Sequence, residues 1–459
     1  MGTFDTLSPE TMHRGAKLFM DRGQVSTYSD ALGMLQGFRI SIAVGHDVAS
    51  SEAAQVALLT AVNAARRSML GGVDVAGCPD VPVQTRLAPA TELRRAIEIL
   101  GGRLVGAVDP TAPVLLLGDV DAPASCGSAL RMTWQGWSGG VVPAASGIRL
   151  DETGNMHIAA VLAASIAVGE VFQRLAGDCA YAGRRSAGLS LWTPSHPWTA
   201  PSSWGPYASW LPSRLWLIGL GNLGQAYLWC LGALPYASRE DVRLVLQDDD
   251  EIQTSNDSTS MLSHPRLIGH LKTRAMAVWA ETIGFTTRLE ERRFGQWTQR
   301  SDFADDPMVA LCGVDNAEAR MVLEEAKFPL VVEAGLGAGP QGYRDWAVHC
   351  FPGARFARDI WGRVASQSAT EDLSSLPAYQ AAQTAGLDPC GVLRLASRTV
   401  GVPFVGITAA AMVIGELLRR IHGGQSFDAL AATMASLDDL ECVPALVSRP
   451  WMYGCAIAR

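Results

Sequence analysis

RLWLIGLGNLGQAYLWCLGAL, residues Arg214–Leu234, carries the strongest fold signal in the chain. Mostly apolar residues run into Gly219, Gly221 and Gly224, and an apolar pattern of helical period follows. A strand, a glycine-rich turn and a helix in this order predict a nucleotide-binding unit. The backbone N–H groups and the positive end of the helix dipole then face a phosphate. The glycines alone are a weak signal and do not identify the nucleotide.

Strands and helices alternate through the second half of the chain. Apolar runs bounded by turn residues predict strands, and longer periodic runs predict helices. We expect strands at Leu215–Gly219, Val242–Gln247, Thr286–Glu290, Met308–Cys312 and Leu330–Ala334, and helices at Leu223–Leu234, Lys272–Ile283 and Ala317–Ala326. This alternation predicts an α/β fold with a doubly wound, largely parallel sheet, in which ligands bind beyond the carboxyl ends of the strands.

A segment rich in Pro, Ser and Trp, residues 191–214, divides the chain and is expected to be a linker. We therefore expect one domain over residues 1–190 and a second over residues 215–459. The second domain is longer than the first, and we expect most of the additional residues in an insertion over residues 335–402.

The two halves share patterns. Ile158–Asp178 and Phe404–Gly424 are both alanine-rich runs of helical character. Phe38–Val62 resembles the strand, turn and helix at Leu215, but its glycine pattern breaks after Gly45. Two explanations remain open. Any two α/β domains share such features, or an old duplication left a first copy without its nucleotide loop.

Composition excludes several classes of function. The net charge of −8 and the lack of basic runs argue against nucleic acid as the main partner. The most apolar segment, Ile158–Phe172, is shorter than the ~20 residues of a membrane span and contains Glu170, so we expect a buried helix and no membrane partner. No signal pattern opens the chain, and the nine cysteines form no CxxC pair. This favours the reducing cytoplasm and predicts no structural zinc.

Polar residues at the ends of later strands and helices limit the reactions that the nucleotide site can catalyse. Asp248 ends the second strand, where an acidic residue binds the ribose of NAD or ATP equally well. Lys272 at a helix start and Asp315 after a later strand add a cation and a second carboxylate. Nucleotidyl transfer uses such a pair, the lysine at the α-phosphate and the aspartate for Mg²⁺, and hydride transfer does not. Singly, Lys272 reads as an exposed lysine and Asp315 as a helix cap.

Four ordered motifs resemble the ThiF/MoeB family, which includes the ubiquitin-activating enzymes: Gly219–Gly224, Asp248–Asn256, Gly269–Lys272 and Asp315–Arg320. The resemblance implies ATP- and Mg²⁺-dependent adenylation of the C-terminal carboxylate of a ubiquitin-like or sulfur-carrier protein. It implies Mg²⁺ on Asp315 and ATP contacts from Gly219, Gly221, Asn222, Gly224, Asp248, Asp250, Asn256, Lys272, Asp315 and Asn316. Thr259 stands where the family usually has arginine, so one phosphate contact is missing or supplied elsewhere.

The family works as dimers or as fused pairs in which a silent copy lends a basic residue. The resemblance therefore implies two Rossmann-like, ThiF-type domains that form a pseudo-dimer, with a silent first domain. Lys17 falls where the lent arginine normally sits, and Arg14 lies one turn earlier. An exposed basic helix face is the alternative interpretation of both residues.

Relatives that pass their cargo onward use a cysteine in an inserted loop to form a thioester. Cys390 precedes the alanine-rich helix, where such cysteines lie, and basic Arg394 and Arg398 follow it. Cys350 is the rival, and either residue can equally be a small buried hydrophobe.

The resemblance extends to the activating components of bacterial ubiquitin-like (Bil-type) conjugation systems, some of which serve antiviral defence. It implies a ubiquitin-like protein and a conjugating enzyme as partners. Three alternatives stay open. The chain can be an adenylyltransferase that stops at the adenylate, a nicotinamide oxidoreductase, or a non-enzymatic scaffold.

Overall fold

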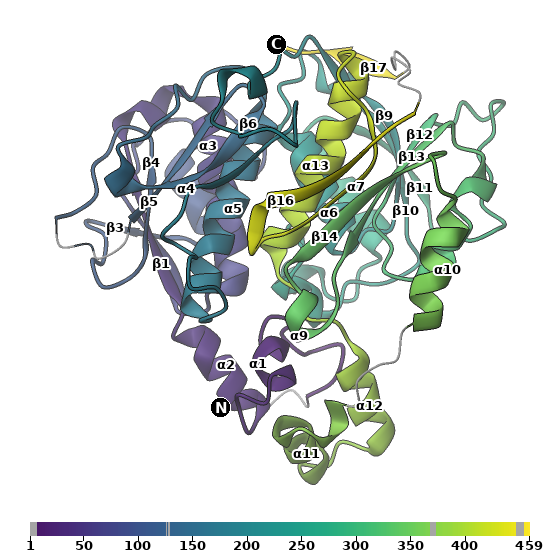
Figure 1. Cartoon of the computed structure of the whole chain (residues 1–459), viewed down its shortest axis with the longest axis horizontal. Coiled ribbons are helices and arrows are strands. Elements are labelled where there is room, and N and C mark those ends of the chain that lie inside the picture. The colour runs from purple at the N-terminus through teal and green to yellow at the C-terminus, as the bar shows by residue number, and fades with distance from the viewer. Residues whose placement is uncertain (1–6, 125, 127–128, 368–372, 447–453) are drawn as a thin grey trace.

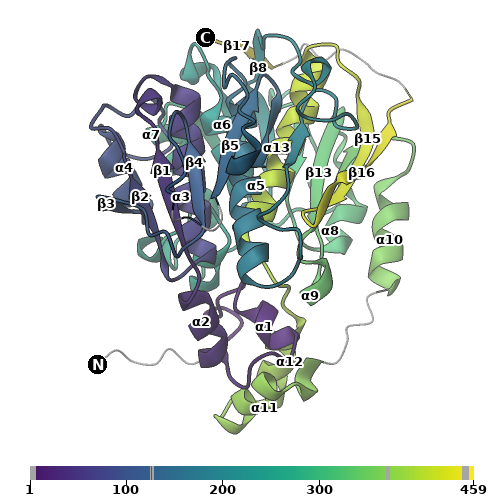
Figure 2. The same cartoon turned by 60° about the vertical axis from the view of Figure 1, so that its left-hand side comes forward.

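The computed structural model describes residues 7–124, 126, 129–367, 373–446 and 454–459. Two sheets, one from each half of the chain, stand on either side of two long central helices (Figures 1 and 2). Parallel pairings dominate both sheets. The predicted α/β class is confirmed.

The first sheet has seven strands in the order β3-β2-β1-β4-β5-β6-β7. Strands β3 to β5 run parallel to one another, and β6 and β7 add antiparallel pairings at one edge. The strands are β1 Arg39–Val44, β2 Gly72–Ala76, β3 Arg103–Val105, β4 Val114–Leu117, β5 Ala129–Gln135, β6 Ser138–Pro143 and β7 Ala187–Ser190.

The second sheet repeats this order and these directions, and then adds one strand: β11-β10-β9-β12-β13-β14-β15-β16. All five strands predicted in this half are present, with ends shifted by at most two residues. The strands are β9 Arg214–Ile218, β10 Arg243–Gln247, β11 Thr286–Glu290, β12 Val309–Cys312, β13 Leu330–Leu336, β14 Asp345–Phe351, β15 Phe427–Thr433 and β16 Ser436–Pro444.

Helices connect and cover the sheets. Those of the first half are α1 Lys17–Asp21, α2 Tyr28–Gln36, α3 Glu52–Ser68, α4 Leu93–Ile99 and α5 His157–Leu175. Those of the second half are α6 Asn222–Ala233, α7 Lys272–Thr282, α8 Ala317–Met321, α9 Gly339–Gly342, α10 Ala357–Gln367, α11 Pro377–Thr384, α12 Pro389–Ser397 and α13 Pro403–Ile421. The predicted helices of the second half are confirmed; the one expected over Ala317–Ala326 continues after α8 as a 3₁₀ turn, Leu323–Ala326.

The central pair of helices is α5 and α13. Both are alanine-rich and buried nearly all round, which allows their backbones to approach closely. The hydroxyls of Ser165 and Thr408 lie 2.9 Å apart where the helices meet. Within the described residues, α5 is the one helix long and apolar enough to cross a membrane, but 89% of its apolar window is buried inside the structure. It is therefore the core helix that the sequence predicts.

Two segments differ from the simple sequence picture. The insertion expected over residues 335–402 starts later in the structure. Residues 335 and 336 still belong to β13, and β14 corresponds to β6 of the first half in strand order and direction. The helices without a first-half counterpart, α10 to α12, therefore follow Phe351. The stretch expected as a linker contains a strand, β8 Trp210–Pro212, which pairs with β17 Cys455–Ile457.

Candidate active site

The glycine-rich turn lies between β9 and α6, at the carboxyl edge of the second sheet. Gly219 has a φ of +84°, which L side chains rarely adopt. A Cβ on Gly224 would lie 2.0 Å from the Gly219 carbonyl oxygen, so strand and helix approach here only with glycine. Around Gly221 no atom lies within 4 Å of an added Cβ. Helix α6 begins at Asn222 with no side-chain cap, so its first amides suit an anion.

Asp248 follows β10 and reaches back to this turn. Its carboxylate accepts hydrogen bonds from the backbone amides of Leu220 at 2.6 Å and Asp250 at 2.9 Å. The side chain is only 8% exposed. Burial raises the pKa of Asp248, while the nearby Lys272 and the two amides act in the opposite direction. The residue expected at the ribose is thus fixed against the turn expected at the phosphates.

Lys272 lies beside Asp248 at the first position of α7. Its Nζ is 2.7 Å from Asp250 Oδ2 and 3.6 Å from Asp248 Oδ1, and its amide donates to the Asp250 carbonyl at 3.0 Å. The residue is 8% exposed, so it is not an ordinary surface lysine. Two carboxylates therefore aim its ammonium at the site of the glycine turn.

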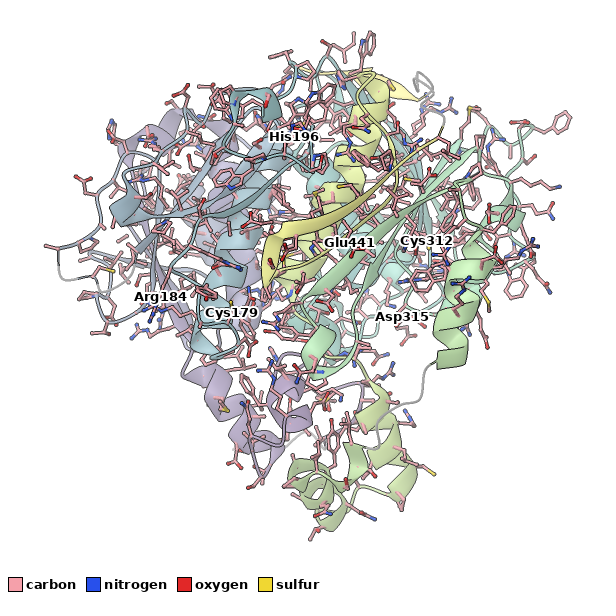
Figure 3. The ribbon with its side chains drawn as sticks, in the orientation of Figure 1. Cys179, Arg184, His196, Cys312, Asp315 and Glu441 are labelled. Atoms are coloured by element: carbon pink, nitrogen blue, oxygen red, sulfur yellow. The ribbon has the colours of Figure 1, made fainter. Side chains whose placement is uncertain are left out.

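Asp315 follows β12, and its loop touches the same turn. A Cβ placed on Gly219 would lie 3.0 Å from the Val314 amide nitrogen. Asn316, and not Asp315, caps α8, because its side chain accepts from Glu318 N at 2.8 Å. Asp315 is exposed at the lower end of the second sheet in Figure 3, below Cys312 on the same strand and loop.

Buried Arg320 anchors the Asp315 loop. Its Nε donates to the Val314 carbonyl oxygen at 2.7 Å, and its guanidinium lies 4.2 Å from the ring centroid of Trp361. Arg320 also lies 3.6 Å from the buried Glu333 carboxylate. The arginine of the fourth motif is therefore a support for the backbone before Asp315.

Arg14, from the first half of the chain, reaches this edge of the second sheet. Its amide donates to Ser258 Oγ at 3.1 Å, and its Nη1 is buried without a hydrogen-bond partner. Burial and, to a smaller extent, the charge of Arg398 lower the pKa of Arg14 to about 10, while Asp315 opposes both. The guanidinium therefore stays cationic at neutral pH. A half-buried cation with one buried nitrogen short of a partner, in the electrostatic reach of Asp315, fits an anionic ligand.

Lys17, the other basic residue considered for this role, lies elsewhere. It is fully buried, and its Nζ donates to both Asp21 oxygens, at 2.6 and 2.7 Å, and to the Tyr379 hydroxyl at 2.8 Å. An exposed basic helix face is wrong for Lys17. Of the two candidates, Arg14 is the one whose surroundings include Asp315.

Comparison with known proteins yields close matches along nearly the whole chain. The family model for the BilD N-terminal domain matches residues 39–191, and that for the BilD C-terminal domain matches residues 211–424. The bacterial E1-like protein BilD of Collimonas sp. (strain OK412) is 49% identical over 451 residues, which covers 98% of this chain and 96% of the relative. The chain belongs to the BilD family of bacterial E1-like proteins. This confirms the predicted ThiF/MoeB, E1-like resemblance and makes the chain a member of an adenylyltransferase family.

Similarity to solved structures is distant. The structure of E. coli MccB with ATP matches 52% of this chain and 64% of MccB, with 10% identity and a TM-score of 0.33. The E. coli tRNA N6-threonylcarbamoyladenosine dehydratase TcdA matches 46% of this chain and 86% of TcdA, with 12% identity and a TM-score of 0.32. The chain thus spans about two thirds of the MccB length.

Three other polar residues of this BilD-family site have different surroundings. The Asn256 Oδ1 accepts from the Gln253 amide at 2.8 Å and so caps the turn Thr254–Ser258. The Asn222 Oδ1 is buried without a partner, against Gly406 of α13. Thr259 is 7% exposed and packs against Gly401. Thr259 therefore fills space beside the Arg14 segment, where the family usually has arginine.

The two candidate cysteines have opposite environments. Cys390 is exposed at the second position of α12, next to Pro389. Cys350 is 3% exposed within β14, paired with Val332, and burial raises its pKa to about 12. A nucleophilic thiolate needs access and ionisation, which favours Cys390 on geometry. Arg394 lies 2.9 Å and Arg398 3.7 Å from the carboxylate of Glu10, so both basic neighbours already have an acidic partner.

The corresponding turn of the first half is closed. A Cβ on Gly45 would lie 2.4 Å from the Asp119 amide nitrogen, and that amide donates to Asp47 Oδ1 at 2.7 Å. Arg149 lies 2.7 Å from Asp47. The Ser51 side chain caps α3 by accepting from Ala54 N at 3.2 Å. In the first half, the Asp47 carboxylate occupies the turn and a side chain caps the helix that follows. At the same position the second half has glycines and a helix whose first amides have no side-chain cap.

Sequence reasoning missed the residues that hold Arg14 in place. The Glu10 carbonyl accepts from the Ser255 amide at 2.7 Å, and Ser258 Oγ accepts from Arg14. Glu10 and Ser258 belong to no motif, although Ser255 lies in the second one, and the Arg14–Ser258 contact spans 244 positions of sequence. Local patterns hold no signal for a contact of this range.

Proposed function

We propose that this chain adenylates the C-terminal carboxylate of a ubiquitin-like protein, using ATP and Mg²⁺, and then carries that protein as a thioester. The observation that supports the first step most strongly is the gathering of Asp248, Lys272, Asp315 and Arg14 around one glycine-rich turn. These residues come from distant parts of the chain. Two cations, a buried carboxylate and an exposed carboxylate beside an uncapped helix suit a nucleoside triphosphate.

Adenylation forms one bond and breaks one. A carboxylate oxygen of the carrier attacks the α-phosphorus of ATP, and the bond to the bridging oxygen breaks. Pyrophosphate leaves with the electron pair. Lys272 stabilises the charge that grows on the α-phosphate oxygens, at a position where Asp248 and Asp250 already orient it. Asp248 binds the ribose hydroxyls in this account.

Asp315 is the residue that would hold Mg²⁺. Its exposure and its position beside the glycine turn fit a hard cation that is shared with phosphate oxygens. When bound, the ion neutralises negative charge on the triphosphate. Arg320 keeps the Asp315 backbone in place through Val314.

Arg14 is the basic residue that the first half lends to this site. Its unpartnered Nη1 and its proximity to Asp315 suit a phosphate oxygen. This contact would replace the one that Thr259 cannot make.

The two halves form a pseudo-dimer in this proposal. Their sheets share strand order and direction, and α5 packs on α13 between them. The first copy is silent, because Asp47 and Asp119 fill its turn. One ATP site per chain follows.

The second step uses Cys390 in this proposal. Its sulfur attacks the carbonyl carbon of the acyl-adenylate, the bond to the phosphate oxygen breaks, and AMP leaves with the electron pair. The thiol proton passes to solvent. The thioester then moves to a conjugating enzyme, as the exposure of Cys390 on α12 allows.

The experiment uses a ubiquitin-like protein with a glycine-ended tail as the carrier. We expect pyrophosphate release with ATP, Mg²⁺ and this carrier, and its loss in Asp315→Ala. A gel without reductant should show a covalent adduct that thiol reagents release and that Cys390→Ser lacks. Pyrophosphate release without an adduct would mean that the protein is an adenylyltransferase that stops at the first step. No release would contradict the proposal.

A further inference from the structure

The helices that carry Cys390 stand apart from both sheets. In Figures 1 and 2, α11 and α12 lie at the lower end of the molecule beside α1. Helix α11 contacts α12, the short turn Leu373–Ser375 and α1 of the first half. The position of Cys390 therefore depends on how this pair of helices is attached to the N-terminal segment.

A buried polar cluster makes that attachment. The Lys17 ammonium donates to both oxygens of Asp21 on α1 and to the hydroxyl of Tyr379 on α11, and that hydroxyl donates to Asp21. Lys17 and Tyr379 are fully buried, and Asp21 is 6% exposed. The Lys17–Tyr379 contact joins positions 362 residues apart. The hydroxyl of Tyr379 is thus the polar link from α11 to the ion pair of α1.

A buried ion pair is weak evidence for stability, because removing both charges from water offsets their attraction. It adds direction to the contact, because a hydrogen bond weakens steeply when its distance or angle departs from the preferred geometry. If α11 shifted along α1, Lys17 and Asp21 would lose their hydrogen bonds with the Tyr379 hydroxyl. The cluster therefore selects one position of α11.

The same N-terminal segment also reaches the candidate active site. The Glu10 carbonyl binds the Ser255 amide, and its carboxylate lies 2.9 Å from Arg394 on α12. The Arg14 amide binds Ser258, and its carbonyl accepts from Gly401 at 3.4 Å. One short segment thus contacts the loop beside Lys272 and Asp315 and the helix that carries Cys390.

We propose that Lys17, Asp21 and Tyr379 are positioning residues that fix α11 and α12, and with them Cys390, relative to the adenylate. This inference rests on the proposed function. In it, the cluster acts on thioester formation more than on adenylation. The described contacts of Lys17, Asp21 and Tyr379 do not reach Lys272, Asp248 or Asp315. Arg14, whose charge acts on Lys17, is held by its own bonds to Ser258 and Gly401. A purely structural cluster would instead support both steps equally.

The test is Tyr379→Phe, which deletes the phenol oxygen and keeps the ring. The matched control is Tyr236→Phe, another buried tyrosine, whose hydroxyl donates to the Pro212 carbonyl at 2.6 Å far from α11. With the glycine-ended carrier, we expect Tyr379→Phe to lower the rate of thioester formation about tenfold and to leave ATP–pyrophosphate exchange within about twofold. Tyr236→Phe should change neither rate. A parallel fall of both rates in Tyr379→Phe, or no fall, would overturn the proposal.

Hydrogen exchange separates this inference from the proposed function, because it needs no substrate. The amides of α11 and α12 should exchange about tenfold faster in Tyr379→Phe than in the wild type, while those of α13 stay unchanged. Equal exchange in both proteins would overturn the positioning role, even if the wild type adenylates nothing. If Tyr379→Phe fails to fold, Asp21→Asn tests the same cluster, because it keeps the shape of the side chain and removes the carboxylate that Lys17 and Tyr379 share. The thioester rate should fall and pyrophosphate exchange should not, and a parallel fall or no fall would overturn the proposal.

Discussion

Arg67 of α3 holds Asp257 of the second half through an ion pair of 3.0 Å, and it also donates to the Met261 and Ser263 carbonyls at 3.0 and 2.9 Å. The Arg67 side chain is 2% exposed. This pair joins the halves at the loop whose Ser258 supports Arg14. The first half therefore shapes the candidate active site by packing as well as by lending a residue.

Loss of this pair should destabilise the chain. In Asp257→Asn the guanidinium of Arg67 stays buried without its counter-charge, which costs about 3 kcal/mol of unfolding free energy. Glu291→Gln is the control, because Glu291 pairs with the exposed Arg274 at 2.7 Å, and loss of an exposed pair should leave the unfolding midpoint nearly unchanged. Urea unfolding measures both variants. Equal midpoints would show that the Arg67 pair does not hold the halves together.

Removal of the Lys272 ammonium should lower the rate of adenylation. Lys272→Met keeps the stem and deletes the charge, so pyrophosphate exchange should fall about 10²–10³-fold. Arg274→Met, two residues along the same helix and directed at Glu291, should exchange at the wild-type rate. A fall of less than about threefold in Lys272→Met would show that this lysine does not stabilise the transition state of adenylation.

The cysteines should differ in reactivity without any substrate. At neutral pH the Cys350 thiol stays protonated, because burial raises its pKa to about 12, and the sheet covers it. Exposed Cys390 should take up iodoacetamide in the native protein, and Cys350 should react only in urea. Mass spectrometry of the digested protein locates the label. Native labelling of Cys350 ahead of Cys390 would contradict the assignment of the nucleophile.

Stability should fall in mild acid because of His13. Burial lowers the pKa of His13 to about 4, and its Nδ1 accepts from the Ala16 amide at 3.3 Å. The unfolded chain binds a proton near pH 6.5 and the folded chain does not. The stabilising contribution is therefore complete above about pH 6.5 and declines toward pH 4 by on the order of 1 kcal/mol per unit.

The variant His13→Asn isolates this effect, because its amide oxygen can accept the same bond without titrating. Unfolding free energies at pH 4.5, 5.5 and 7 should diverge between wild type and variant as pH falls. Parallel curves would mean that His13 is protonated in the folded chain as well.

The local sequence pattern was enough to predict the strands and helices around the glycine turn. The spacing of the apolar residues and the turn residues between them determine these elements without distant contacts. It also placed Asp248, Lys272 and Asp315 at strand and helix ends that meet at one edge of the sheet. The strand Asp345–Phe351 was missed, because it lies among Gly- and Pro-rich turns and pairs with strands on either side.

Contacts between the halves were beyond local reasoning. Lys17 looked like a surface lysine because no local feature reveals Asp21 and Tyr379 around it. Whether Arg14 or Lys17 faces the second half depends on how α1 meets the loop Thr254–Ser258, and tertiary packing alone determines that. The closure of the first-half turn likewise follows from Asp119, which lies 72 positions beyond Asp47.

The most direct test of the central claim is a structure of the chain with Mg²⁺ and a non-hydrolysable ATP analogue. The account predicts a single nucleotide, with its phosphates on the Gly219–Gly224 turn, Lys272 at the α-phosphate and Mg²⁺ on Asp315. Nucleotide bound at the first-half turn, or Lys272 and Asp315 directed at separate places away from the phosphates, would contradict it.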